Sequence, residues 1–525
     1  MILNRLRNSD NLLFIGLMML AVGLPLSLFL TSLSQFFIGA SLFLEGSLTE
    51  KLRRFGRNRL AILLVVLFLF HIIGLLWTSD MNEGLKDLRI KLPLLILTVV
   101  LSASMPLSKS KFEFVCRSFV ASVFIGSMVS MAVYTGIIER EIQSIREIFI
   151  FNISHIRFSL FICLSIFILI LEAFNAYKRK ATSSIIVSIV GVLWFIYFLI
   201  FMESMTGMII LIVTAIIHLV MVGIRSSNKL IRALTLLSAI VIPLLIVIEL
   251  NGILKEYSHK ESLQIDLTEK TMQGNPYTFL QDKEEYENGF PIWVYICEQE
   301  MRPAWNKVSV IQYDSLDERR QALKYTLIRF LTSKGLRKDA EGIAALSSEE
   351  IKSIERGIAN VKYQNLSDAR IRLVQIIWEF DQFRRGSNPS GHSVTQRFEF
   401  WKAAKGIIAS HPIIGVGTGD MPASYREQYN KMKSPLEEKF RLRAHNQYLA
   451  LAVGLGIPVM IYFILFLVYS IISQKRWNNF LFLSFWIIAV LSMLTEDTLE
   501  TQSGVTFFAF FFCFLAFYKP QFEKD

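Results

Sequence analysis

Charged residues are scarce in this sequence, and so are cysteines. Charged side chains make up 19% of the 525 residues, while 53% are hydrophobic. Soluble domains carry about 25% charged residues, so this balance excludes an ordinary soluble protein and indicates a polytopic membrane protein. Of the four cysteines, only Cys297 lies in the long polar segment at residues 251–446. A disulfide within that segment is therefore excluded, and the cysteine spacing fits no metal site.

An excess of one charge is also missing from the long polar segment. The formal net charge of the chain is +11, which alone would allow a nucleic-acid partner. Residues 251–444, however, hold 29 basic and 26 acidic side chains. The excess is concentrated in short loops between apolar runs, as is typical of cytoplasmic connections between membrane helices. We therefore expect a lipid bilayer around the chain and no nucleic-acid partner.

Long apolar runs fill most of the remaining sequence. A helix that crosses a bilayer needs about 20 predominantly apolar residues. The runs predict an all-α polytopic membrane protein with about 12 transmembrane helices and one large, mostly helical external loop domain. The expected spans are residues 12–30, 33–48, 60–77, 92–107, 112–135, 157–176, 183–202, 207–224, 233–250, 447–472, 480–495 and 503–518.

The basic loops predict how these spans are oriented. They lie at residues 108–111, 177–182, 225–232 and 474–479, all on one side of the membrane if the spans are counted as above. The positive-inside rule then places both termini in the cytoplasm. We therefore expect three parts. These are helices 1–9 in residues 1–250, a loop domain outside the membrane in residues 251–446, and helices 10–12 with a short cytoplasmic tail in residues 447–525.

The external loop has the composition of a folded domain, because it contains several tryptophans and amphipathic stretches. Residues 314–333 place their apolar side chains on one helical stripe. Ser347 and Glu350 form a capping-box pattern that opens a second helix. Residues 367–378 predict a third helix, and residues 386–391 are a turn-rich break.

The segment from Arg441 to Gly456 returns the loop to the membrane. His445 stands at the boundary with the next apolar run, after Arg443 and before Asn446. Histidine is suited to moving a proton near neutral pH, and arginine is suited to holding phosphate. This combination favours chemistry on a lipid-linked phosphate. The alternative is an interfacial histidine that only anchors the end of the helix.

A second group of polar residues comes before it. Arg397 and Trp401 are four residues apart and share one face of a helix, which must stop at Pro412. Gly415 and Gly417 follow, and their N–H groups could form an anion-binding turn. A plain glycine-rich turn between two helices is the alternative.

Other polar residues carry weaker signals. His71 and His218 are lone histidines within apolar runs, which is typical of packed core residues, and His411 before a proline favours a helix cap. No acidic pair stands out as a metal site. We therefore expect neither a metal nor another cofactor.

These motifs together resemble a known family. The run Arg397…Trp401…His411-Pro412-Ile-Ile-Gly415-Val-Gly417 is followed by Ala444-His445-Asn446-Gln-Tyr-Leu449. This pattern looks like the signature region of the O-antigen ligase and O-antigen polymerase superfamily. His155-Ile-Arg157-Phe-Ser159 and Glu203-Ser-Met205-Thr-Gly207 are similar to other parts of it, except that the family often has an arginine where this chain has Met205.

The resemblance implies a metal-independent glycosyltransferase that moves a glycan from an undecaprenyl-diphosphate carrier to an acceptor hydroxyl. It also implies a bacterial inner membrane, with the loop domain at residues 251–446 in the periplasm. The acceptor would be a lipid A-core sugar in a ligase, a growing glycan in a polymerase, or a protein in an O-oligosaccharyltransferase. His445 would be the general base. The expected diphosphate contacts are Arg397, Arg157, Arg441 and Arg443. The expected supporting residues are Asn446, Trp401, Gly415 and Gly417.

The departure at Met205 removes one expected diphosphate contact, and Arg157, Arg89 or Lys91 could replace it. Two other classes of function stay open. A flippase for lipid-linked glycans should carry charged residues along its spans and have near-equal halves with short loops. A scaffold protein that binds partners through its loop is excluded only by the grouping of histidine and arginines.

Overall fold

The computed structural model describes residues 2–44, 47–104, 107–140, 147–149, 151, 153–257, 266, 268–280, 285–366 and 368–517. The chain is 73% helical, and its described residues contain two short strands. The expectation of an all-α membrane protein is confirmed at this level. The predicted helix start at Ser367 and the tail at 518–525 lie outside the described residues.

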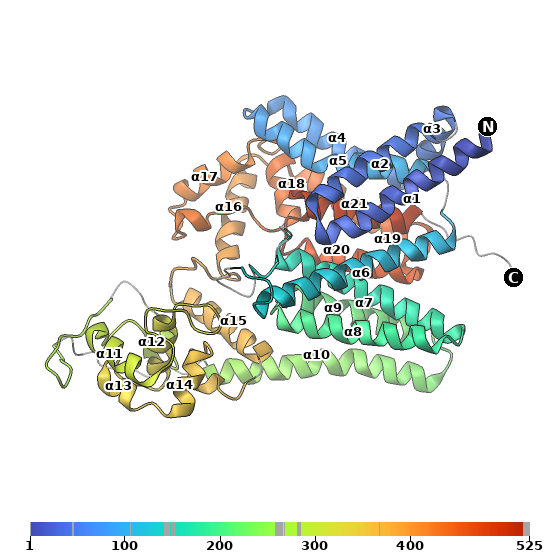
Figure 1. Cartoon of the computed structure of the whole chain (residues 1–525). Coiled ribbons are helices and arrows are strands. Elements are labelled where there is room, and N and C mark those ends of the chain that lie inside the picture. Colours follow the sequence, from blue (N-terminus) through green and yellow to red (C-terminus); the bar gives the residue numbers. More distant parts are fainter. Residues whose placement is uncertain are drawn as a thin grey trace. The chain divides into compact units, whose positions relative to one another are not determined.

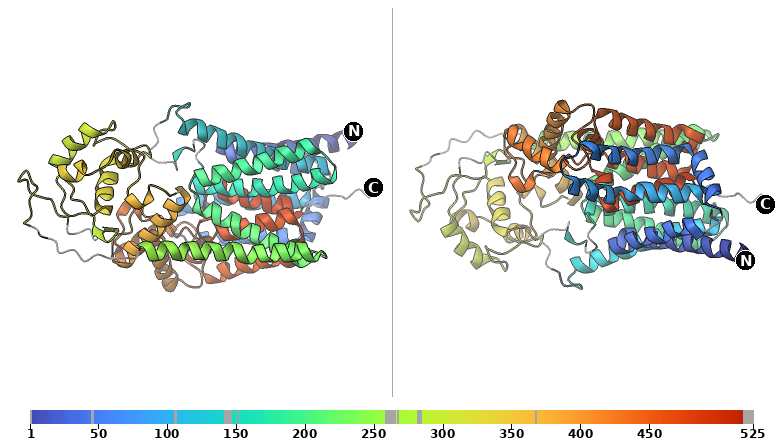
Figure 2. Two further views of the ribbon diagram at one scale, coloured as in Figure 1. Left: turned by 90° about the horizontal axis from the view of Figure 1, so that it is seen from below. Right: turned by 90° about the horizontal axis from the view of Figure 1, so that it is seen from above.

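The chain divides into two compact units. The first comprises Met1–Thr135, Phe149–His218 and Arg397–Asp525, and the second comprises Gly136–Ile148 and Leu219–Gln396. The long helices of the first unit run side by side in both views of Figure 2. Its elements, of which Figure 1 labels the α-helices, begin with α1 (Ile2–Leu26), α2 (Leu28–Leu44), α3 (Leu48–Arg57), α4 (Arg59–Ile73), η1 (Gly74–Trp77), α5 (Met81–Ala103), α6 (Lys109–Tyr134), α7 (His155–Lys178), α8 (Thr182–Phe201) and α9 (Met205–Arg225).

The later elements of this unit carry the candidate site. They are α16 (Gln396–Ser410), α17 (Met421–Lys431), η4 (Glu438–Phe440), α18 (Gln447–Leu455), α19 (Ile457–Ile472), η5 (Ser473–Asn478), α20 (Phe480–Ser492), η6 (Thr498–Glu500) and α21 (Gln502–Phe517). Their core is rich in phenylalanine. On α21, for example, every phenylalanine from Phe507 to Phe514 is buried.

Seven helices of the described residues are long and apolar enough to cross a membrane: Arg59–Trp77, Lys109–Tyr134, His155–Lys178, Thr182–Phe201, Met205–Arg225, Lys229–Ile253 and Ile457–Asn478. Three shorter apolar helices lie at Asn11–Leu26, Phe480–Ser492 and Gln502–Phe517. The chain is thus a multi-pass membrane protein, while the count of about 12 spans stays a prediction.

The span predicted at residues 447–472 is wrong, because two helices meet there at Gly456. This glycine has a φ of +88°, and a Cβ at its position would lie 2.0 Å from the carbonyl oxygen of Ile413. The next residue, Ile457, donates its N–H to Pro412 O over 2.9 Å. The glycine-rich turn after α16 therefore packs against the break, where only glycine fits.

The start of the span predicted at residue 92 also differs, since α5 begins at Met81. Asp80 caps this helix by accepting the Glu83 N–H over 3.0 Å. Asp87 and Lys91, which precede the predicted span, find charged partners inside the protein. A buried ion pair thus extends the helix beyond its apolar part.

The second unit has its own hydrophobic core around Trp305, Tyr313, Leu327 and Phe330. Its elements are α10 (Lys229–Tyr257), β1 (Tyr286–Glu287), β2 (Phe290–Pro291), α11 (Glu298–Val308), α12 (Leu323–Ser333), α13 (Ala340–Ala344), α14 (Ser348–Glu355), η3 (Val361–Tyr363) and α15 (Asp368–Arg384). The two strands pair antiparallel.

The helices predicted within residues 251–446 are largely present. The capping box of Ser347 and Glu350 is confirmed, and α15 confirms the helix expected after residue 367. The helix predicted from residue 314 starts only at Leu323. Before it, Asp317 accepts the N–H of Gln321 over 2.9 Å, and Arg320 has a φ of +63°. These two features form a turn that no helix can contain.

Candidate active site

His445 lies between η4 and α18, in an unusual backbone conformation. Its φ of +44° falls in the left-handed region, which costs a residue other than glycine about 1–3 kcal/mol. The flanking residues hold it there. Trp401 Nε1 donates to Ala444 O over 3.0 Å, and Asn446 caps α18 by accepting the Leu449 N–H over 3.0 Å. Such strain is typical of residues whose side chain must be aimed precisely.

A second loop, between α20 and α21, brings three buried acidic residues to this point: Glu496, Asp497 and Glu500. Gln447, two residues after His445, ties the two loops together. Its Nε2 donates to Glu500 Oε1 over 3.2 Å, and its Oε1 accepts the Leu499 N–H over 2.6 Å. The histidine and the acidic residues are thus held as one unit.

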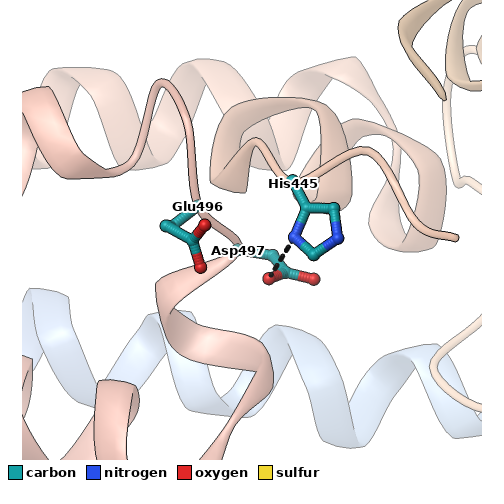
Figure 3. Close-up of side chains that lie close together, drawn as sticks. All are labelled: His445, Glu496 and Asp497. Carbon is teal, nitrogen blue, oxygen red and sulfur yellow. Dashed lines mark ion pairs between the residues drawn. The ribbon is translucent and has the colours of Figure 1, made fainter. Parts of the chain in front are cut away.

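Asp497 faces the imidazole of His445, as Figure 3 shows. Oδ1 of Asp497 lies 3.6 Å from Nδ1 of His445, and its Oδ2 lies 3.3 Å from Nε of Arg443. The first contact is longer than a hydrogen bond, and no described residue makes a hydrogen bond with the buried Nδ1. The contact is therefore a longer polar contact, which becomes an ion pair only when the imidazole carries a proton.

The pKa of Asp497 lies below its usual value. Burial raises this pKa, but the contacts with His445 and Arg443 lower it by a larger amount. Asp497 is thus ionised at neutral pH, as the partner of a histidine base should be. The other ring nitrogen of His445 points away from this carboxylate (Figure 3).

Glu496 lies between two of the predicted arginines. Arg157, at the start of α7, places Nη2 at 3.9 Å from Oε2, and Arg397, in the first turn of α16, places Nη2 at 3.7 Å from Oε1. Both distances exceed hydrogen-bond length, and Nε of Arg157 is buried with no hydrogen bond to a described residue. The pKa of Glu496 is raised, because burial outweighs the attraction of His445 and the arginines.

Lys91 is committed to a different set of partners. Its Nζ lies 2.5 Å from Asp87 Oδ1 and 2.8 Å from Glu500 Oε2, and the side chain is fully buried. Removing one partner of a buried ion pair typically costs about 3–5 kcal/mol. Lys91 therefore anchors Glu500, which leaves Arg157 and Arg89 as candidates for the contact missing at Met205.

Two other predicted parts of the site, Arg441 and the turn at Gly415 and Gly417, make hydrogen bonds to neighbouring residues. Arg441 lines the same cavity as His445, but its Nε donates to Leu436 O and its Nη1 to Asn430 Oδ1 over 2.8 Å, not to the acidic residues. The turn at Gly415 and Gly417 does not present free donors. The Gly415 N–H donates to His411 O over 3.2 Å, and the Gly417 N–H to Gly454 O over 2.9 Å. These bonds favour a plain glycine-rich turn.

The lone histidines are packed among other residues. Nδ1 of His71 lies 2.9 Å from Leu67 O, and Nε2 of His218 lies 2.8 Å from Ser484 Oγ. Both positions fit core residues, as the sequence suggests.

A cavity of about 660 Å³ opens beside His445. Its lining joins the first half of α5 to α17 and to the loop before α18. Among the lining residues are Asp87, Tyr425, Arg426 and Arg443. A volume of this order suits a ligand of several rings, and His445 is the side chain in its wall best suited to accept a proton.

The group of Glu496, Asp497 and Glu500 is the main feature of the site that was not predicted from the sequence. His445, Glu496 and Asp497 also place one ligand atom each within 4.8 Å of one another, close enough to hold one metal ion. A signal for them was present: three acidic residues within residues 496–500, between two apolar runs and without a basic neighbour. Acidic residues at a membrane boundary require cations from elsewhere in the chain.

Comparison with known proteins relates part of the chain to a family. A family model described as O-antigen ligase matches residues 353–464, which run from α14 into α19 and include Arg397 and His445. No curated protein matches the chain.

Proposed function

We propose, from the premise that this chain belongs to the O-antigen ligase family, that it transfers a glycan from an undecaprenyl-diphosphate carrier to an acceptor hydroxyl. Membership supports a transferase of polysaccharide assembly. The observation that carries the finer proposal is the arrangement of His445 against Asp497 beside two arginines that share Glu496.

His445 acts on the acceptor in this scheme. The acceptor hydroxyl enters the cavity beside His445 and gives its proton to the ring nitrogen that points away from Asp497. Its oxygen then forms a bond to the anomeric carbon of the donor sugar. The bond from that carbon to the diphosphate breaks, and the diphosphate leaves with the electron pair. Asp497 stabilises the imidazolium that forms, as carboxylates do in other histidine bases.

Arg157 and Arg397 act on the donor. Their side chains are 17% and 18% exposed, and their contacts with Glu496, at 3.9 and 3.7 Å, are longer than hydrogen bonds. Their donors are therefore available to a diphosphate. Charge grows on the diphosphate as it leaves, and fixed cations stabilise it. Glu496 would compete with this anion. Burial raises the pKa of Glu496, so this carboxylate takes up a proton from water more readily than an exposed one when the donor binds.

A second cavity supports a lipid-linked donor. It measures about 430 Å³ and lies between α2, α5 and the start of α21. Ile90 lines both this cavity and the one beside His445. The exposed Arg89 lies at its edge, where it could replace the contact missing at Met205. We place the isoprenoid chain next to the diphosphate in this cavity.

The transferase should work without a metal ion. Arg157 and Arg397 flank Glu496, and Arg443 flanks Asp497, so a metal ion between these carboxylates would meet three cations. We expect turnover to be unchanged by EDTA. Loss of turnover that Mg²⁺ or Mn²⁺ restores would instead assign His445, Glu496 and Asp497 to a metal site.

The proposed topology puts the site on the periplasmic side of a bacterial inner membrane, with both termini in the cytoplasm and residues 251–446 outside. Cysteine labelling tests this orientation. A Ser348→Cys variant should react in intact cells with a reagent that cannot cross the inner membrane. Reaction only after that membrane is opened would reverse the topology.

A chromosomal deletion tests the function and separates its versions. All versions predict that the lipid-linked donor accumulates on the periplasmic face. Loss of long polysaccharide on lipid A identifies a ligase, chains of one repeat identify a polymerase, and unmodified secreted proteins identify a protein transferase. Accumulation on the cytoplasmic face would instead favour a flippase. Unchanged glycans and unchanged donor levels would contradict the proposal.

A further inference from the structure

A third cavity, of about 740 Å³, lies away from the candidate active site. Its lining comes from α6, α7 and α8, which are three of the helices able to cross a membrane. None of the site residues described above lines it. Both α6 and α8 pack against α7 (Figure 1), and the cavity is a groove between these three helices.

The groove has the length of one leaflet. On α8 its lining runs from Ser183 to Phe195, which is about 18 Å at 1.5 Å per residue. Half of a bilayer's hydrocarbon core is about 15 Å. Trp194 lies near the end of the groove that is deepest in the bilayer. There its Nε1 donates to Ser127 Oγ over 2.8 Å, and its ring contacts Phe124. The apolar wall is open, since Val187 is 69% exposed.

The end of the groove at the membrane surface is polar and basic. Arg117, Arg179, Ser183 and Ser184 line it together with Glu172. The Glu172 carboxylate is engaged by Arg117, at 2.6 Å from its Nε. No acidic side chain of the described residues forms an ion pair with the exposed Arg179, and Lys178 and Lys180 stand on either side of it. An uncompensated positive charge therefore lies at the end of α7.

We propose that this groove binds one phospholipid with an anionic headgroup of the phosphatidylglycerol class. The phosphate lies at Arg179 and the hydroxyls of Ser183 and Ser184, and one acyl chain follows the groove to Trp194. Clusters of basic residues at the cytoplasmic ends of membrane helices attract anionic lipids in this way.

The occupant is not the glycan carrier. Arg157 lies in the first turn of α7 and Arg179 directly follows the last turn, so about 33 Å of helix separates them. The two ends of α7 thus face opposite sides of the bilayer. A diphosphate held at Arg157 cannot reach Arg179. The lipid site is therefore independent of the proposed transfer reaction.

Tryptophan fluorescence tests the site on the full-length protein. Vesicles of phosphatidylcholine receive increasing amounts of phosphatidylglycerol or phosphatidylcholine with dibrominated acyl chains, which quench nearby tryptophans. The signal of Trp194 is the difference between wild type and Trp194→Phe. One arginine near an anionic headgroup is worth about 1 kcal/mol, or a factor of about five. Half-maximal quenching should therefore need about fivefold less brominated phosphatidylglycerol than brominated phosphatidylcholine.

Three variants test whether the charged residues of the groove cause this lipid preference. Arg179→Gln should remove the preference for phosphatidylglycerol. Glu172→Gln should increase it, because the groove loses a negative charge and Arg117 keeps only its longer contact with Glu113, at 3.5 Å. Lys111→Gln removes a basic residue that does not line the groove, so it should leave the preference unchanged. Equal quenching by both lipids in the wild type, or an unchanged preference in Arg179→Gln, overturns the proposal. Neither result bears on glycan transfer.

Discussion

Replacing His445 with glutamine is expected to lower turnover by about 10²–10⁴-fold, which is the usual contribution of a positioned general base. Glutamine keeps much of the shape and one hydrogen bond but cannot take the proton from the acceptor hydroxyl. Binding of the donor should be unchanged, because the proposed diphosphate contacts belong to Arg157 and Arg397. The measurement is the initial rate of glycan transfer in proteoliposomes that contain the purified variant, donor lipid and acceptor.

His411→Gln is the matched control, because it removes another histidine of the same region that lies at the end of α16 and outside the acidic group. It should keep wild-type turnover. Near-normal turnover of correctly inserted His445→Gln would falsify the base role. His445 would then be the residue that anchors the end of α18 at the membrane boundary.

Asp497→Asn should reduce turnover less, by about 10–100-fold, as is typical when the partner that orients a functional histidine is lost. A double variant tests whether Asp497 acts through the imidazole. In the His445→Gln background, Asp497→Asn should cost almost no further turnover, because the ring on which Asp497 acts is already gone. A further loss of turnover in the double variant would mean that Asp497 does not act through His445.

The helices of the membrane part could largely be predicted from the sequence, because an apolar run long enough to cross a bilayer has few other stable structures in lipid. The errors occur where polar contacts decide the outcome. The run at residues 447–472 breaks at Gly456, since the backbone near Ile413 leaves no room for a side chain. The extension of α5 depends on Lys91 meeting Glu500, a partner 409 residues later in the chain.

The candidate site was predictable only in part, for a related reason. Histidine and arginine at a membrane boundary have a chemistry that the residue types themselves suggest, so His445, Arg397 and Arg443 could be chosen from their positions. Glu496 and Asp497 belong to a separate loop that reaches His445 through hydrogen bonds of Asn446 and Gln447. No periodicity or spacing encodes those contacts.

Arg397 carries the second large effect. Arg397→Gln removes a cation from the position where charge is expected to grow on the leaving diphosphate. The loss of one such stabilising group costs about 10²–10³ in kcat. Arg397→Lys keeps the charge but loses the planar fork that can hold two oxygens, so its rate should fall between those of Arg397→Gln and wild type. Initial rates at varied donor concentration separate the two effects, since loss of transition-state contact lowers kcat whereas loss of uniform binding raises the KM for the donor.

The matched control is Arg441→Lys. Arg441 belongs to the same stretch as His445, but its guanidinium donates hydrogen bonds to Leu436 O and Asn430 Oδ1. This variant should therefore keep the wild-type kcat. Arg157 shares Glu496 with Arg397, and Arg157→Lys should therefore resemble Arg397→Lys. If Arg397→Lys showed the same kcat and the same donor KM as wild type, while Arg157→Lys was impaired, the diphosphate would be held at α7 alone. Arg397 would then act only on Glu496, by keeping that carboxylate beside His445.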